Sequence, residues 1–80
     1  MGARVVRLKC ETAEYQAVTN ELKGFEVRKN DREFRAGDII ILEEVVMGVP
    51  TGRTHSVGQI RYILDGGKWG LEKGYCIFNW

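Results

Sequence analysis

The chain is poor in the residues that build metal sites and disulfide frameworks. Its 80 residues include one histidine, His55, and two cysteines, Cys10 and Cys76, with no CxxC or HxxxH spacing. The sequence therefore predicts no metal site, no cofactor and two free thiols rather than a disulfide. Ser56 follows His55 directly, so on a strand the two side chains point to opposite faces and do not form a catalytic pair. We expect His55 at a strand edge, where it binds nothing.

Long apolar runs and a strong charge imbalance are also absent. No segment approaches the roughly 20 apolar residues that span a bilayer. The first nine residues hold three basic side chains and no apolar stretch of the secretory kind, which predicts a cytoplasmic protein with no membrane partner. The net charge of +1 argues against coating nucleic acid by bulk electrostatics, but it leaves room for a local basic cleft.

The composition is that of one small globular domain, residues 1–80. At 44% hydrophobic and 29% charged residues, the chain has too many apolar side chains for a disordered segment. A domain of this size buries only roughly 60% of its unfolded surface, so each large apolar residue matters. Ten glycines and a single proline indicate many turns between short strands.

Hydrophobic periodicity predicts an α+β order. Residues 4–10 alternate and read as a first strand. Thr12 can cap a helix of about 9–11 residues, whose stripe is Tyr15, Val18 and Leu22. Further strands are predicted at 25–28, 39–46, 55–64 and 75–80, with loops at 29–36 and 47–54 and a bulge or close backbone approach at Gly58. The expected fold is a small β-barrel of about five strands with one short helix after the first strand.

The segment 22–32, LKGFEVRKNDR, concentrates charge of both signs: six of its 11 residues are ionic. If 25–28 is a strand, Phe25 and Val27 face the core while Glu26 and Arg28 share the other face. One interpretation is a solvated edge that makes modest cross-strand ion pairs. The other is a site, to which Lys9 on a neighbouring strand also contributes.

Several kinds of chemistry suit such a site. Arginine and lysine hold phosphate, and glutamate and asparagine hydrogen-bond base edges. A Lys–Glu pair in a partly dry cleft can also transfer protons, since burial shifts both pKa values toward neutrality. Aromatic side chains either stack on bases or fill the core; they are Tyr15, Tyr62, Tyr75 and Trp69, whereas Trp80 is expected to cover one end of the barrel.

Nearly the whole chain, from about Leu8 to the last expected strand, resembles a known family. LKGFEVRKNDREFRAGDIIILEE, preceded by RLKCETAEYQAV and followed by PTGR and QIRYIL, resembles small bacterial and phage proteins of the ASCH branch of the PUA superfamily. Their motif is close to G-x-K-x-F-E-x-R-x-N-D-R, then F-x-x-G-D, then Y-T-G-R. Glu21 replaces the motif glycine, Pro50 replaces the tyrosine, and the segment 6–9 lacks the histidine often found in relatives.

The resemblance implies a PUA-like barrel whose cleft, beside the helix, binds RNA, modified bases or nucleotides. The residues it brings to that cleft are Lys9, Lys23, Glu26, Arg28, Asn30, Arg32 and Thr51. Asn30, Asp31 and Arg32 are alternatively the frame that holds the loop.

Two other functions stay open. One similar lineage hydrolyses acetylcytidine, so the alternative is a small amidohydrolase acting on a modified nucleoside. Lys23 would then be the base or nucleophile and Glu26 a proton carrier, although Glu26 stands where that lineage has a threonine. The other alternative is a protein-interaction module whose charged segment is a docking edge.

Overall fold

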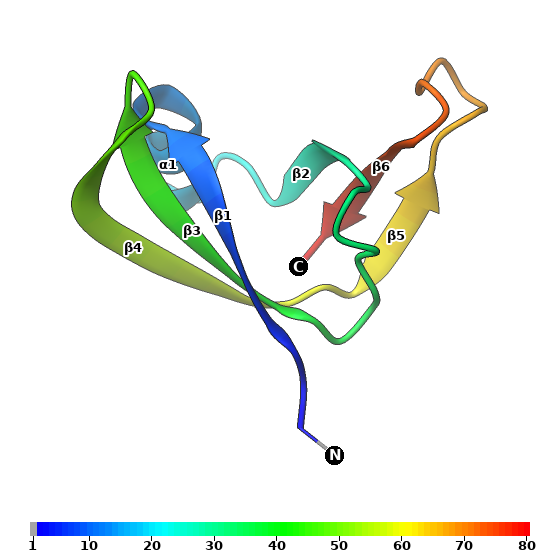
Figure 1. The fold of residues 1–80 in the computed structure, drawn as a ribbon, viewed down its shortest axis with the longest axis horizontal. Coiled ribbons are helices and arrows are strands. Elements are labelled where there is room, and N and C mark those ends of the chain that lie inside the picture. The colour runs from blue at the N-terminus through cyan, green and yellow to red at the C-terminus, as the bar shows by residue number, and fades with distance from the viewer. Residues whose placement is uncertain (1) are drawn as a thin grey trace.

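The computed structural model describes residues 2–80 as six strands and one short helix (Figure 1). The elements are β1 (Val5–Glu11), α1 (Thr12–Thr19), β2 (Phe25–Lys29), β3 (Ile39–Val46), β4 (Val49–Gln59), β5 (Tyr62–Asp65) and β6 (Tyr75–Asn79). The predicted α+β class and the position of the helix after the first strand are confirmed.

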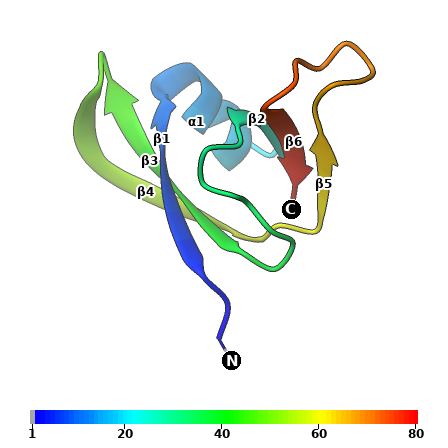
Figure 2. The same ribbon diagram turned by 45° about the vertical axis from the view of Figure 1, so that its right-hand side comes forward.

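The strands form two sheets of three. The first sheet has the order β1-β3-β4 and the second sheet has the order β2-β6-β5. β1 runs parallel to β3, and the other neighbouring pairs are antiparallel. Figure 1 shows the two sheets spreading apart from the region where β4 leads into β5, and Figure 2 shows the same opening from the side. β1 and β2 are therefore outer strands that face each other across the molecule.

The core lies between the two sheets, where the inner side chains of β1 and β3 form one buried cluster with Phe34, Ile60, and Cys76 and Phe78 of β6. β1 turns Val6, Leu8 and Cys10 inward, and its parallel register sets them beside Ile40, Leu42 and Glu44 of β3. Because β1 is separated from β3 by a helical crossover, the parallel pairing follows the usual rule for such connections. α1 packs on β1 and β3 through the buried side chains of Tyr15 and Val18.

The predicted strand count and one predicted loop are wrong. The expected strand 55–64 is divided at Ile60 and Arg61, and its two parts, β4 and β5, belong to different sheets. The expected loop 47–54 shrinks to the turn Met47–Gly48, whose φ angles of 51° and 81° suit a two-residue hairpin connection. β4 therefore begins at Val49. The predicted irregularity at Gly58 is confirmed: the β3–β4 register shifts beside it, and its φ is 87°.

The predicted small, partly closed β-barrel is not found among residues 2–80, whose six strands form two open sheets. Closure would require backbone ladders between β1 and β2 and between β4 and β5, and the described sheets contain neither. The seam between β1 and β2 is therefore open. At that seam a side chain, Arg28, reaches the Lys9 carbonyl instead.

The helix is shorter than the sequence predicts. It ends at Thr19, and the amides of Leu22 and Lys23 both donate to the carbonyl of Ala17 in the following turn. Leu22 is 82% exposed, so it does not belong to the buried stripe. Thr12 is the first helical residue rather than the cap, a position taken by Glu11 without a side-chain hydrogen bond. Across residues 2–80, no helix is long and apolar enough to cross a membrane.

Candidate functional site

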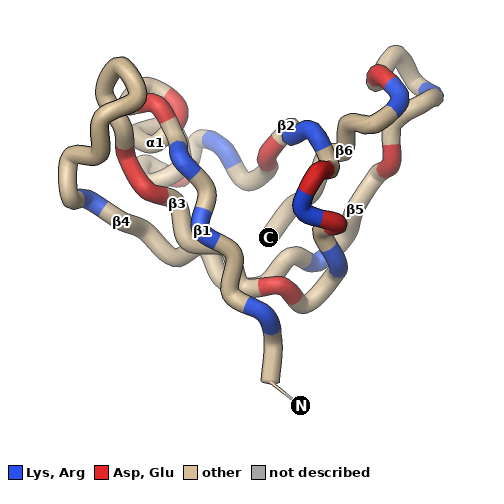
Figure 3. The backbone as a smooth tube through the Cα atoms, in the orientation of Figure 1, with Lys and Arg blue, Asp and Glu red and all other residues tan. Residues whose placement is uncertain are grey.

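A cleft of about 500 Å³ opens between the outer strands β1 and β2, beside α1. It is called the β1–β2 cleft below. Its lining is Lys9, Cys10, Glu11, Glu14, Lys23, Phe25, Glu26, Val27 and Arg28. The three cations and three carboxylates of this set balance each other. Figure 3 shows basic and acidic positions interspersed along β1, α1 and β2.

Glu26 is the centre of the ionic network in the cleft. Its side chain is 5% exposed, and its carboxylate lies between two cations. Lys23 Nζ is 2.9 Å from Oε1, and Arg28 Nε is 2.9 Å from Oε2. A buried carboxylate needs such partners, because removing an unpaired charge from water costs several kcal/mol.

The two faces of β2 are reversed relative to the prediction. Phe25 and Val27 were expected in the core, but they are 45% and 48% exposed, while Glu26 is buried. The alternation itself is correct, and Glu26 and Arg28 do share a face. The face was assigned wrongly because β2 is an outer strand whose inner side meets the ionic cleft rather than an apolar core.

Lys23 is held by two carboxylates and an aromatic ring. Its Nζ is 2.6 Å from Glu14 Oε2 and 2.9 Å from Glu26 Oε1, and it lies 5.5 Å from the centre of the Phe25 ring. Burial works to lower the pKa of Lys23, but the hydrogen bonds to the two carboxylates outweigh it and raise the pKa above its usual value. The hydrogen bond from Lys23 lowers the pKa of Glu14. The Lys23 amine is therefore a fixed cation at neutral pH.

Two arginines cap the open edge of β1. Arg28 Nη2 donates to the Lys9 carbonyl at 2.6 Å, and Arg32 Nη1 donates to the Arg7 carbonyl at 3.4 Å. These carbonyls are two residues apart on one strand, so they face the same side. Unpaired edge carbonyls invite pairing with another chain, and the arginines supply donors that occupy them.

Both cysteines are buried free thiols, as the sequence predicts. Cys10 lines the cleft, and burial, together with the nearby negative charge of Glu26, raises the pKa of its thiol. Burial also raises the pKa of Cys76, with Asp65 adding to the effect. Neither is activated as a nucleophile, since reactive cysteines have lowered pKa values.

Three of the predicted binding residues lie outside the cleft lining: Asn30, Arg32 and Thr51. Asn30 Oδ1 accepts a hydrogen bond from the Phe34 amide at 2.9 Å and so folds the connection after β2. Thr51 donates to Glu44 Oε1 at 2.7 Å, at the β3–β4 end of the first sheet. The structure brings the other four, Lys9, Lys23, Glu26 and Arg28, into one cleft.

Sequence reasoning missed five cleft residues and the buried Glu44. The five are Cys10, Glu11 and Glu14, together with Phe25 and Val27, which were assigned to the core. The position of Glu14 at the cleft could have been predicted. Glu14 is in the first turn of α1, directly after β1, so it lies close to the end of that strand. Glu44 follows Glu43 in the apolar strand β3, and nothing in the neighbouring sequence predicts that Glu44 is buried and accepts a hydrogen bond from the Thr51 hydroxyl.

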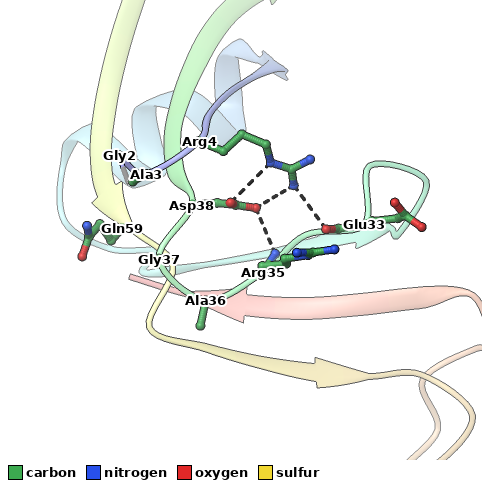
Figure 4. Close-up of a pocket in the computed structure, with 9 residues that line it drawn as sticks. All are labelled: Gly2, Ala3, Arg4, Glu33, Arg35, Ala36, Gly37, Asp38 and Gln59. Carbon is green, nitrogen blue, oxygen red and sulfur yellow. Dashed lines mark hydrogen bonds and ion pairs between the residues drawn. The ribbon is translucent and has the colours of Figure 1, made fainter.

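A second pocket, of about 630 Å³, lies beside the start of β1 (Figure 4). Arg4 Nη2 is 2.7 Å from Asp38 Oδ2, and the same guanidinium donates to the carbonyls of Arg32 and Glu33. Burial alone would raise the pKa of Asp38, but the hydrogen bonds from Arg4 and the Arg35 amide lower it. These groups satisfy one another and join β1 to the connection between the sheets.

The fold and the cleft define the class of protein: a small α+β domain with a charge-balanced cleft between the open edges of two sheets. Within residues 2–80, no group of three or more His, Cys, Asp or Glu side chains is placed to hold a metal ion. Residues 5–80 match the family described as "Domain of unknown function (DUF3850)", and the chain belongs to that family.

A relative is found in a phage. The chain is 40% identical over 53 residues to a protein of Escherichia phage P2 described as "Uncharacterized 12.9 kDa protein in GpA 3'region". The matched segment is 66% of this chain and 49% of the phage protein, so the match spans about half the length of that relative.

Proposed function

We propose that this domain is an RNA- or nucleotide-binding module and that the β1–β2 cleft receives the base. The observation that carries the proposal is Glu26, a nearly dry carboxylate at an open cleft, fixed by Lys23 and Arg28. An ionised carboxylate has about four acceptor positions, and the two cations use two of them. The remaining positions suit the N–H donors of a base edge, such as the amino group of cytosine.

The ion pairs in the cleft indicate that different residues contact the base and the phosphate. Lys23 and Arg28 are already neutralised by carboxylates, so they are poor candidates for the main phosphate contact. Lys9 lines the same cleft, is exposed and forms no ion pair within residues 2–80. We assign the phosphate contact to Lys9 and the base contact to Glu26.

The resemblance to the ASCH branch of the PUA superfamily supports the same proposal. The motif residues Lys23, Glu26 and Arg28 gather at one cleft beside α1, which is where that resemblance implies a ligand site. Six strands and one helix in two open sheets agree with a PUA-like domain only in class and element order. Membership of the PUA superfamily is therefore also a proposal.

The geometry does not favour the amidohydrolase alternative. That reaction asks Lys23 to act as base or nucleophile, which requires an unprotonated amine. The raised pKa of Lys23 and its two carboxylate partners keep the proton on nitrogen.

The proposal is tested by titrating the ¹⁵N-labelled domain with AMP, GMP, CMP and UMP and following amide shifts. We expect saturable shifts confined to residues 9–11 and 23–28. Lys9→Glu should weaken nucleotide binding by about fivefold to tenfold, because it replaces attraction to phosphate with repulsion. Lys9 is the variant of choice because Lys23→Ala or Arg28→Ala would also remove a partner from buried Glu26.

Lys73→Glu is the matched control, since it changes the net charge equally at an exposed position outside the cleft. It should alter affinity less than twofold. Absence of shifts at millimolar nucleotide, or equal losses in the two variants, would overturn the proposal. Binding of a protein partner without nucleotide binding would instead favour the interaction module.

A further inference from the structure

The face of the second sheet opposite Glu26 is largely apolar and partly exposed. It is called the outer face, and its apolar residues are Phe25, Val27, Tyr62, Leu64, Tyr75 and Ile77. Phe25, Val27 and Tyr62 are exposed, and the other three are half-buried. The register aligns Phe25 and Tyr62 on either side of Asn79, and Val27 and Leu64 on either side of Ile77. Tyr62 is 66% exposed. Large apolar side chains gathered on one exposed face indicate an interaction surface.

The outer face is continuous with the β1–β2 cleft through Phe25. This residue lines the cleft, and its ring lies beneath the Lys23 amine, yet its side chain is on the outer side of β2. A ligand that leaves the cleft over the β2 edge therefore meets the Phe25 ring first. Tyr62 follows two strands away, roughly 10 Å from Phe25 at the spacing of adjacent strands.

The size of the outer face distinguishes between possible occupants. Three strands of about five residues give a footprint of roughly 14 by 17 Å, or about 240 Å². Even if this area is doubled to allow for the uneven side-chain surface, it is below the roughly 800 Å² that each partner buries in a stable protein complex. The area suits two or three planar rings laid on aromatic side chains. Lys29, opposite Tyr75 in the register, adds a cation on the same face.

We infer that the outer face is a second subsite, on which bases of a single-stranded nucleic acid stack after the strand leaves the β1–β2 cleft. Phe25 and Tyr62 supply the stacking rings, and Lys29 lies close to the backbone phosphates. This inference rests on the proposed function and narrows its ligand from a nucleotide to a single strand. Stacking on aromatic side chains tolerates any base, because every base has a π face.

The test compares a mononucleotide with short oligonucleotides, using labelled RNA of one, three and five nucleotides and fluorescence anisotropy. Binding to the unaltered domain should tighten about fivefold or more from one to five nucleotides. Tyr62→Ala should remove most of that gain and leave mononucleotide binding unchanged. Tyr62→Phe should retain the gain, because the ring is kept. Trp69→Ala is the matched control, since Trp69 is 80% exposed and lies outside the outer face.

The outcomes separate the two proposals. If the unaltered domain does not bind mononucleotides, the proposed function is wrong. Mononucleotide binding with no gain in longer RNA, or a gain that survives Tyr62→Ala, would overturn the outer-face inference alone. Sedimentation velocity gives the remaining outcome. A concentration-dependent dimer that Tyr62→Ala converts to monomer would assign the outer face to a second copy of the chain, and it would also overturn the outer-face inference.

Discussion

At the scale of single residues, the cleft is organised by a carboxylate that has little access to water. Lys23 and Arg28 each approach one of the two oxygens of the Glu26 carboxylate. Lys23 in turn shares its charge with Glu14, whose side chain is 58% exposed. Glu14 and Glu26 thus bind the same amine, one from solvent and one from the interior. The two ion pairs should contribute unequally to stability, since exposed pairs contribute about 0–1 kcal/mol and buried ones cost more to break.

Glu26→Ala should therefore lower the free energy of unfolding by about 2–4 kcal/mol, because it leaves Arg28 and Lys23 partly buried without their shared counter-charge. Glu14→Ala removes the exposed partner of the same lysine and should cost less than about 1 kcal/mol. Urea unfolding followed by tryptophan fluorescence measures both. Equal losses in the two variants would mean that Glu26 contributes no more than a surface carboxylate.

At the scale of elements, the sequence predicts β1, β3 and β6 well because their periodicity reflects burial directly. The alternation of Val6, Leu8 and Cys10 is enough to place β1. The position of β2 and its alternation can be predicted equally well, but the face that it turns inward cannot. Alternation defines two faces of a strand without showing which of them meets the core. Glu26 is buried only because cations from α1's turn and from β2 itself surround it.

The connection 30–38 shows the same limit on prediction. The sequence predicts a polar connection over 29–36 with Phe34 as its anchor, and Phe34 is 5% exposed, with its ring centre 4.9 Å from that of Phe78. Asn30 fixes this arrangement by accepting the Phe34 amide. The local sequence could predict that Phe34 anchors the connection. It could not predict that Phe34 packs on Phe78, because Phe78 is far away in the sequence.

Asn30→Ala should destabilise the domain by about 1–3 kcal/mol, since it leaves the partly buried Phe34 amide without an acceptor. Asn30→Asp keeps an oxygen in that position and should retain most of the stability. Thermal unfolding measures the change, and nucleotide affinity measured well below the transition should be unaltered in both variants. A loss of affinity with unchanged stability would show that Asn30 contacts the ligand.

At the scale of the whole molecule, the two sheets are joined at one end and open at the other. Two of the three connections that cross between the sheets, β2–β3 and β4–β5, meet at Gly37, Asp38 and Ile60: the Gly37 amide donates to the Ile60 carbonyl, and the Ile60 amide donates to the Asp38 carbonyl. Arg4 adds its ion pair with Asp38 at the same place (Figure 4). The opposite end, where β1 and β2 do not pair, is the β1–β2 cleft. The joint therefore holds the two sheets together at the end away from the cleft.

Asp38→Asn tests this joint through pH. The folded-state pKa of Asp38 is lowered, so its carboxylate stabilises the domain fully above the unfolded value of about 3.9, and this contribution is lost as the pH falls through the folded-state pKa. We expect Asp38→Asn to cost about 1–3 kcal/mol at pH 7, and we expect the difference from the unaltered domain to shrink below about pH 4. Urea midpoints from pH 7 to pH 3 measure it. Asp65→Asn, at an exposed position, should track the unaltered domain, and a pH-independent cost of Asp38→Asn would show that Asp38 acts through packing rather than through its charge.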